Sequence, residues 1–287
     1  MATLDTALLE VHQLSKTFGG LIALESVDLV VPAGAIVSLI GPNGAGKTTL
    51  FNCITGHYSP TSGKLLFKGE SLMDLQPHEV ALKGVSRTFQ GIRIFSGMTA
   101  MENVMVGAHC RTKTGLWGAI FKTGRVIEEE RTLASDAFKL LEFVGLSTKA
   151  DDWAANLCYG DQRRLEIARA LATQPALLLL DEPAAGMNPR ETQDLMALIQ
   201  RIRQQGATIL LIEHDMKVVM GISDRVVVLD YGVKIAEGPP EQVRHDSRVI
   251  EAYLGRDGSK QASPGATTGS GGIGGATAPH GVPQDKE

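Results

Sequence analysis

The residues of this chain whose types and spacing most clearly indicate chemistry form a glycine-rich loop over residues 41–48. The loop reads Gly-Pro-Asn-Gly-Ala-Gly-Lys-Thr, which matches the pattern G-x-x-x-x-G-K-[ST]. Glycines let backbone N–H groups turn inward around a phosphate, and a helix that starts at the end of the loop adds partial positive charge. Lys47 would reach the terminal phosphates, and the Thr48 hydroxyl would bind Mg²⁺. We expect the phosphates to be bound by Gly41, Pro42, Asn43, Gly44, Ala45, Gly46, Lys47, Thr48 and Thr49.

Two acidic residues can complete such a site. Asp181 ends the apolar run over residues 177–180, and Glu182 follows it directly. A carboxylate at the end of a buried strand emerges at the edge of a sheet, where Asp181 could hold the water shell of Mg²⁺. Glu182 could then polarise a water molecule for attack on a phosphate. Without the loop, both residues would read equally well as solvent-exposed ends of a strand.

An α/β sheet must position the loop and the two carboxylates. Apolar runs bounded by turn residues predict strands at residues 8–14, 23–31, 35–40, 177–180, 208–212 and 225–229. The run at 35–40 leads into the loop, and a helix should start at Gly46. Strands that alternate with helices are typical of a mainly parallel sheet. The sequence therefore predicts an α/β fold class.

A helical region interrupts this pattern between residues 99 and about 173, which are rich in helix formers. Thr99 and Glu102 have the spacing of a capping box that opens a helix. Further along, Asn188 and Pro189 supply an N-cap and a first-turn proline for a helix that Gly206 can end. We read residues 99–173 as a helical subdomain inserted in the sheet domain.

Composition indicates one globular domain followed by a tail. The chain has 287 residues, of which 43% are hydrophobic, enough for a core. From residue 258 onward it is dominated by Gly, Ser, Thr, Ala and Pro, which predicts a disordered tail over residues 258–287. With 28 basic and 32 acidic side chains, the net charge of −4 argues against a dedicated nucleic-acid binder.

Cysteine usage and hydropathy predict a cytosolic protein. Cys53, Cys110 and Cys158 are odd in number and lack metal-ligand spacing, so we expect reduced thiols. The first ten residues lack the basic and apolar segments of a secretory signal. No stretch approaches the roughly 18 apolar residues of a membrane helix. Work at a membrane would therefore require a partner.

Four short motifs, taken in order, resemble those of the ATP-binding subunits of ABC transporters. The glycine-rich loop is followed by Gln90, by the segment Leu-Cys-Tyr-Gly-Asp-Gln at residues 157–162, by the run ending in Asp181 and Glu182, and by His214. The resemblance extends from about residue 8 to residue 255. It implies a P-loop NTPase sheet domain over residues 1–257, with a mainly parallel core, an antiparallel β subdomain and an inserted α-helical signature subdomain. It also implies ATP and Mg²⁺ as ligands.

The resemblance implies a role for each matching residue. Gln90 would sense Mg²⁺ and water and couple to the permease, His214 would contact the γ-phosphate, and Phe18 would stack on adenine. The signature segment would present a helix N-terminus to a nucleotide bound by another subunit. Its expected contact residues are Cys158, Gly160, Asp161 and Gln162.

The chain departs from the family pattern at two positions. Cys158 stands where the family usually has serine, and a thiol donates a weaker hydrogen bond than a hydroxyl. Packing at a helix start is the alternative role for Cys158. Asn188 stands where most members have aspartate, which leaves its part in catalysis open.

Within the family, the motifs are most similar to the ATP-binding subunits of branched-chain amino acid importers. This resemblance implies three kinds of partner: a second ATP-binding subunit (a sister protein or a second copy), two membrane permeases and, indirectly, a periplasmic binding protein. It also implies a location at the cytoplasmic face of the bacterial inner membrane. Importers of urea, amides or other amino acids, and exporters of lipid or lipopolysaccharide, are alternatives. A permease helix could dock near residues 91–99 or 115–121, although subdomain core explains the latter equally well.

Two hypotheses come from other functional classes. A soluble ABC ATPase acting on ribosomes or DNA usually has two nucleotide-binding domains or a long coiled-coil insertion, and this chain shows neither. A regulatory module that holds ATP without turnover is disfavoured by the presence of Lys47, Asp181, Glu182 and His214.

Overall fold

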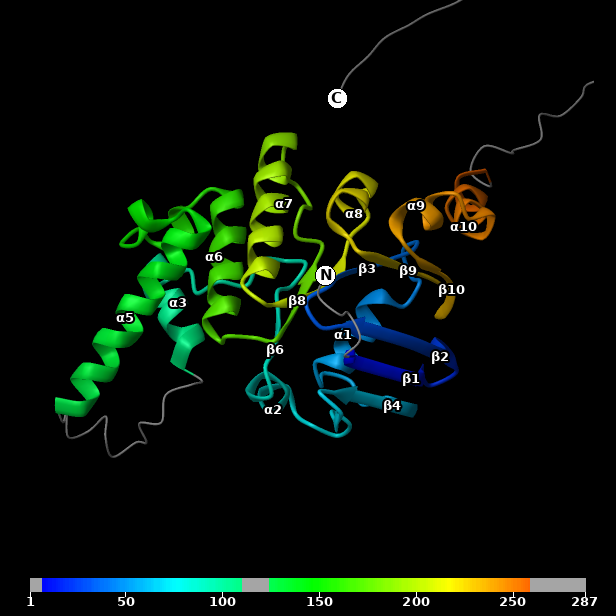
Figure 1. Cartoon of the computed structure of the whole chain (residues 1–287), viewed down its shortest axis with the longest axis horizontal. Helices are drawn as coiled ribbons and strands as arrows, with labels where there is room; N and C mark the ends of the chain where they lie inside the picture. Colours follow the sequence, from blue (N-terminus) through cyan, green and yellow to red (C-terminus); the bar gives the residue numbers. More distant parts are fainter. Residues whose placement is uncertain (1–6, 110–123, 259–287) are drawn as a thin grey trace, which may run out of the picture.

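The computed structural model describes residues 7–109 and 124–258, which form two sheets flanked by helices (Figure 1). Cys110, the segment 115–121 and the expected tail beyond residue 258 lie outside the described residues. The strands are β1 (Ala7–Phe18), β2 (Leu21–Pro32), β3 (Ile36–Ile40), β4 (Ser62–Phe67), β5 (Glu70–Ser71), β6 (Val85–Arg87), β7 (Leu177–Asp181), β8 (Thr208–Ile212), β9 (Arg225–Asp230) and β10 (Val233–Gly238).

The larger sheet has the order β10-β9-β3-β8-β7-β6. The strands from β9 to β6 pair in parallel, and β10 joins the edge antiparallel to β9. The strand order is not the sequence order. Parallel neighbours must be joined by crossover connections, which here pass through helices. The expected α/β class with a mainly parallel core is confirmed.

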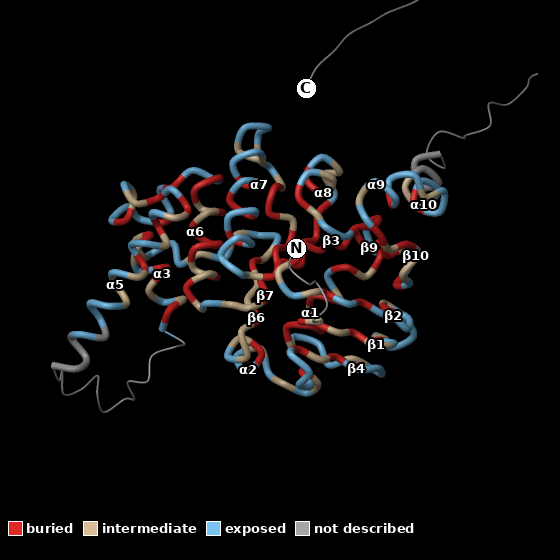
Figure 2. The backbone as a smooth tube through the Cα atoms, viewed as in Figure 1, coloured by how far each residue is buried: buried red, intermediate tan, exposed pale blue. Residues whose placement is uncertain are grey.

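Alternating side chains of the central strands supply two cores. Val37 and Leu39 on β3 face the antiparallel sheet and helix α1. Leu178 and Leu180 on β7 face the opposite layer of helices. Both faces are therefore covered, which explains why these strands read as continuous apolar runs rather than as alternating ones. Figure 2 shows the buried residues following the strands through the middle of the molecule.

The smaller sheet is antiparallel, with the order β2-β1-β4-β5. Its first two strands were expected from the sequence, and both are longer than their apolar runs. Four strands were not expected: β4, β5, β6 and β10. β5 and β6 are too short for a periodic signal, and β4 opens on the polar sequence Ser-Gly-Lys. Their pairing partners, rather than their own composition, hold them in the sheets.

Helices cover the larger sheet and form the ends of the molecule in Figure 1. They are α1 (Lys47–Ile54), α2 (Pro77–Leu82), α3 (Ala100–His109), α5 (Gly124–Val144), α6 (Tyr159–Ala172), α7 (Pro189–Gln204), α8 (Met216–Ile222), α9 (Pro240–Arg244) and α10 (Ser247–Gly258). Single 3-10 turns lie at Ser147–Lys149 and Ala154–Asn156. α3, α5 and α6 pack on one another at one end, and α9 and α10 lie at the other.

Both expected helix starts carry the predicted caps. The backbone N–H of Thr99 donates to the Glu102 carboxylate at 2.8 Å, and the Glu102 N–H donates back to the Thr99 hydroxyl at 3.2 Å. The Asn188 side chain accepts from two N–H groups of the first turn of α7, each at 3.0 Å. Gly206 follows the end of α7 with a φ of 96°. Local sequence signals therefore decide where these helices begin and end.

Gly41 is the tightest glycine of the loop between β3 and α1. Its φ is 147°, and a Cβ at this position would lie 2.0 Å from the carbonyl oxygen of Leu229 on β9. No real Cβ atom approaches a backbone oxygen so closely. The first glycine of the loop is thus required by the neighbouring strand as well as by any phosphate.

We expect Gly41→Ala to lower the free energy of unfolding by about 3 kcal/mol, because it adds backbone strain and overlaps β9. Gly34→Ala is the matched control. Gly34 also has a positive φ, 73°, but a Cβ added there would meet nothing within 4 Å. Gly34→Ala should therefore lower the free energy of unfolding by only about 1 kcal/mol. Urea denaturation measures both, and equal losses would contradict the steric argument.

Candidate functional site

A pocket of about 480 Å³ lies over the glycine-rich loop. The loop supplies its floor, and the turn between β1 and β2 supplies one wall. Gln90 and Glu182 close it on another side. The expected residues that line the pocket are Phe18, Asn43, Gly44, Ala45, Gly46, Lys47, Thr48, Thr49, Gln90 and Glu182. These expected residues come from four separate stretches of sequence that meet at one cavity.

The loop has the shape of an anion cradle at a helix N-terminus. Gly46 is the N-cap of α1, with a φ of 99°, and a Cβ there would lie 2.6 Å from the carbonyl oxygen of Ala23. The ammonium group of Lys47 is folded over the loop, donating to the carbonyl oxygens of Gly41 at 2.7 Å and Pro42 at 2.9 Å. N–H groups of the loop and of α1 and the Lys47 cation are therefore available to one anion.

Glu182 is the centre of a cluster of polar side chains at the mouth of the pocket. It follows β7 with a φ of 47°, and its N–H donates to the Ile212 carbonyl oxygen at 2.9 Å. The side-chain amide of Gln90 donates to Glu182 Oε2 at 2.9 Å, and His214 Nδ1 lies 3.8 Å from the same oxygen. The three residues expected to be catalytic therefore meet, although they lie far apart in the sequence.

Asp181 is buried and paired with an arginine that could not be identified from the sequence. Arg87, at the end of β6, donates to Asp181 Oδ2 at 2.7 Å and to Asn52 Oδ1 at 2.6 Å. Both members of the ion pair are almost fully buried. Asp181 is not among the residues that line the pocket. Arg87 therefore fixes the carboxylate just behind the loop, on the neighbouring strand.

Glu213 is a second residue that the sequence motifs did not single out. Its side chain is 1% exposed and accepts from the backbone N–H groups of Ala184 at 2.9 Å, His214 at 3.0 Å and Asp215 at 3.3 Å. It ties the segment after Glu182 to the segment that carries His214. Its position directly before His214, at the end of an apolar strand, was the only available signal.

An exposed apolar wall flanks the loop. Phe18 is 41% exposed, and its ring lies edge-on to Tyr58 with 5.2 Å between the centroids. Leu21, Ile22 and Tyr231 line the same wall and are also exposed. Tyr231 comes from the turn between β9 and β10, so its place here could not be read from the sequence. This wall offers the flat apolar surface that a nucleobase requires.

The signature segment lies away from this pocket. Cys158 is exposed and is the N-cap of α6. Asp161 accepts from Lys149 Nζ at 2.5 Å, and the Gln162 amide donates to the Ala154 carbonyl oxygen at 3.2 Å. Burial alone would raise the pKa of Asp161, but hydrogen bonds from Lys149 and Cys158 outweigh it and hold the pKa below its usual value. These side chains shape the start of α6, where no side chain caps the N–H groups.

A buried ion pair on α6 binds the loop that carries Gln90. Arg163 and Glu166 are at most 1% exposed and lie 2.7 Å apart. Arg163 donates to the carbonyl oxygens of Phe89 at 2.6 Å and Gln90 at 2.8 Å. Glu166 accepts from the N–H groups of Phe89 at 3.3 Å and Arg93 at 3.2 Å. The pair therefore fixes the backbone around Gln90 to the signature helix.

We expect Arg163→Met to lower the free energy of unfolding by about 3 to 5 kcal/mol, since it leaves the Glu166 carboxylate buried without its partner. Changing both residues, Arg163→Met with Glu166→Leu, should recover part of the loss because no buried charge remains. Urea denaturation of the three proteins gives the comparison. A double variant less stable than the single one would contradict this account.

Curated proteins resemble the chain over most of its length. It is 51% identical over 249 residues to the high-affinity branched-chain amino acid transport ATP-binding protein BraF of Pseudomonas aeruginosa, a match that covers 86% of this chain and 98% of that protein. The corresponding LivG protein of Escherichia coli K12 gives the same identity and coverage.

Solved structures and family models agree with these relatives. The ADP conformation of an ATP-binding cassette of an ABC transporter superposes with a TM-score of 0.77 at 34% identity, covering 88% of this chain and all of that one. A nucleotide-free cassette gives a TM-score of 0.76 at 33% identity, covering 86% and 99%. The model described as ABC transporter matches residues 24–185, and the model described as branched-chain amino acid ATP-binding cassette transporter matches residues 233–259. The chain belongs to the ABC transporter family, as one of its ATP-binding cassettes.

Proposed function

We propose that this chain binds and hydrolyses ATP to drive the import of branched-chain amino acids. The observation that carries the proposal is the meeting of Gln90, Glu182 and His214 at the mouth of the phosphate-loop pocket. Two relatives at 51% identity, and the family model that matches residues 233–259, are named for branched-chain amino acid transport. The site supports the chemistry, and the relatives support the solute.

Each wall of the pocket suits a different part of ATP. The phosphates lie in the loop over residues 41–49, where N–H groups and Lys47 neutralise their charge. The adenine lies against the wall that contains Phe18 and Tyr231. His214 is 60% exposed and free to reach the γ-phosphate beside Glu182. One nucleotide can therefore contact all the residues that line the cavity.

The residues present fit Mg²⁺. Among the described residues, no group of three His, Cys, Asp or Glu side chains could hold a metal ion. Mg²⁺ requires no such group, because it keeps several waters and binds through one or two protein groups and the phosphates. Thr48, Gln90 and Asp181 would hold it. When bound, it neutralises charge that develops on the phosphates.

Glu182 is the proposed general base. Its carboxylate takes a proton from a water molecule as the water oxygen forms a bond to the γ-phosphorus. The bond between that phosphorus and the bridging oxygen breaks, which gives ADP and inorganic phosphate. Gln90 holds one carboxylate oxygen at 2.9 Å and so fixes its direction.

The signature segment serves a nucleotide on a second cassette, a sister protein or another copy. Cys158 and Gly160 lie at the start of α6, outside the pocket described above. Helix N-termini bind anions through their free N–H groups. Two cassettes paired head to tail would thus each complete the other's site, and ATP would hold them closed until hydrolysis.

A groove of about 600 Å³ beside the loop of Gln90 is the proposed docking site for one of the two permeases. It is lined in part by Arg93, Phe95 and Val106, and the last two are 45% and 39% exposed. An amphipathic cytoplasmic helix of a permease would bury this apolar surface. The Arg163–Glu166 pair binds the floor of the groove, so a displaced permease helix would move Gln90.

The proposed location is the cytoplasmic face of the bacterial inner membrane. In the part of the chain that the structure describes, no helix has the length and apolar character to cross a bilayer. Attachment would come through the permeases, and a periplasmic binding protein would deliver the amino acid to them from the other side. The cassette itself would never touch the solute.

We expect Glu182→Gln to reduce uptake of labelled leucine to the level of a source strain that lacks this chain, because loss of a general base slows hydrolysis by about 10² to 10⁴-fold. Wild type should restore uptake in the same strain. The measurement is initial uptake rate, with isoleucine, valine, urea and acetamide as competitors.

Competition identifies the solute, and nucleotide binding is the control. Isoleucine and valine should compete, and urea and acetamide should not. Purified Glu182→Gln must still bind ATP, so that lost uptake reports hydrolysis rather than folding. Unchanged leucine uptake in the deletion strain, with no redundant importer, would contradict the assignment to branched-chain amino acids.

We expect Cys158→Ser to leave the ATPase rate of the assembled transporter unchanged or to raise it. A hydroxyl donates a stronger hydrogen bond than a thiol and keeps the bond to Asp161. Cys158→Ala removes the donor and is the matched comparison. A tenfold or greater fall in the rate of Cys158→Ser would show that the thiol itself is needed.

A further inference from the structure

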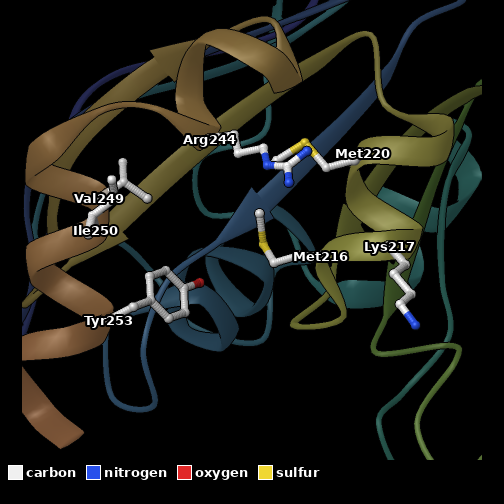
Figure 3. Close-up of a pocket in the computed structure, with 7 residues that line it drawn as sticks. All are labelled: Met216, Lys217, Met220, Arg244, Val249, Ile250 and Tyr253. Atoms are coloured by element: carbon white, nitrogen blue, oxygen red, sulfur yellow. The ribbon is translucent and has the colours of Figure 1, made fainter.

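A second hollow, of about 550 Å³, lies between α8 and the C-terminal helices α9 and α10 (Figure 3). Its walls are apolar residues of α8 and α10 together with three residues that have polar tips: Met216, Met220, Val249 and Ile250, with Lys217, Arg244 and Tyr253. Its volume lies within the range of about 300 to 1,000 Å³ found for small-molecule sites. None of these residues belongs to the ATP pocket.

Arg244 brings a cation to this apolar space. In Figure 3 its guanidinium points across the hollow toward Met220. Among the described residues, no carboxylate forms an ion pair with it, and nearby Asp246 is bound by Arg248 at 2.7 Å. A planar guanidinium is suited to a carboxylate because it can donate two parallel hydrogen bonds.

Tyr253 brings a second polar atom from the opposite side. Its hydroxyl oxygen is buried beside the backbone of Gly41 and makes no hydrogen bond of normal geometry to a described residue. Figure 3 shows it pointing toward Met216. A buried hydroxyl without a partner is costly, and a ligand oxygen within reach would remove that cost.

We propose that this hollow binds an aliphatic carboxylate. The carboxylate would pair with Arg244 and accept from Tyr253, and the hydrocarbon chain would lie along Val249, Met216 and Met220. Methionine side chains adapt to flexible aliphatic groups because they are unbranched and polarisable. Apolar walls with a few converging polar groups are the usual composition of a ligand site.

The position of the hollow makes the ligand a regulator of the ATP site. α8 begins two residues after His214, with Asp215 as its N-cap. On the other wall, Tyr253 abuts Gly41, the first residue of the phosphate loop. A ligand that moves α8 relative to α10 would therefore act on the segment that carries His214 and on the phosphate loop. Residues 233–259, which match the model of the branched-chain class, supply most of the second wall.

The carboxylate could come from a fatty acid or from a branched 2-oxo acid, so decanoate and 4-methyl-2-oxopentanoate are the two probes. Each is titrated into the full-length protein carrying ¹³C-methyl methionine, with Met216→Leu and Met220→Leu used to assign the signals. We expect the Met216 and Met220 methyl resonances to shift and saturate with at least one acid. The stronger probe identifies the source.

Two variants separate a built site from general attraction to positive charge. Lys217 lies on α8 with the two methionines and also lines the hollow, but it is exposed and Figure 3 shows its ammonium pointing away from Arg244 and Tyr253. Arg244→Gln should weaken binding at least about tenfold, while Lys217→Gln should change it less than about twofold. Decanol, which has the chain but no carboxylate, should bind at least about tenfold more weakly than decanoate.

The site is overturned if neither acid shifts the two methyl resonances, if decanol binds as well as decanoate, or if Lys217→Gln weakens binding as much as Arg244→Gln. Methyl shifts that depend on protein concentration and not on the acid would assign the hollow to a second copy of the chain. Methyl shifts on removal of residues 259–287 would assign it to the tail. Binding of a nonhydrolysable ATP analogue then tests the regulatory role. Its affinity should change with the acid in wild type but not in Arg244→Gln, and an unchanged affinity in wild type would overturn that role.

Discussion

The parallel register of three central strands is the constraint on which the site depends. Leu39 on β3 pairs with Ile212 on β8, and Ile212 pairs with Asp181 on β7. The carboxyl ends of these strands therefore lie side by side. Each of the next residues along the chain belongs to the site: the glycine-rich loop follows β3, Glu182 follows β7 and His214 lies two residues beyond β8. Ligands of open α/β sheets bind at such an edge for this reason.

Buried charges make this edge rigid. The ion pair of Arg87 with Asp181 joins β6 to β7, and the Glu213 carboxylate joins the segments that follow β7 and β8 through three backbone N–H groups. A buried charge is stabilised by its partner, and removing that partner is costly. These contacts therefore hold the carboxylates and the backbone of His214 in one arrangement.

The same type of contact links the ATP pocket to two more distant surfaces. Arg163 and Glu166 fix the loop of Gln90, and with it the apolar groove near Phe95, to the signature helix. At the other end of the molecule, Tyr253 lies against Gly41. The first is the proposed permease groove, and the second is the proposed carboxylate site. The first is joined to Gln90 by hydrogen bonds, and the second touches the phosphate loop through the contact of Tyr253 with Gly41.

The sequence by itself determined the local features. The glycine pattern, the apolar strands and the caps at Thr99 and Asn188 are set by residues close together in the chain, so the loop, the α/β class and the helix starts could be predicted. The residues expected to bind ATP were predicted partly from the family resemblance. The pairing of Gln90 with Glu182 was not predicted, because no sequence spacing measures a distance across a sheet.

Tertiary structure alone decided which polar residues are buried. Arg163 and Glu166 look like ordinary charged positions on a helix, and Arg87 like a strand end, yet each is enclosed by segments far away in the sequence. Tyr231 reaches the ATP pocket and Arg244 reaches the second hollow only because β9, β10 and the C-terminal helices fold beside the phosphate loop and α8. Burial depends on neighbours from distant parts of the chain, and local sequence carries no record of them.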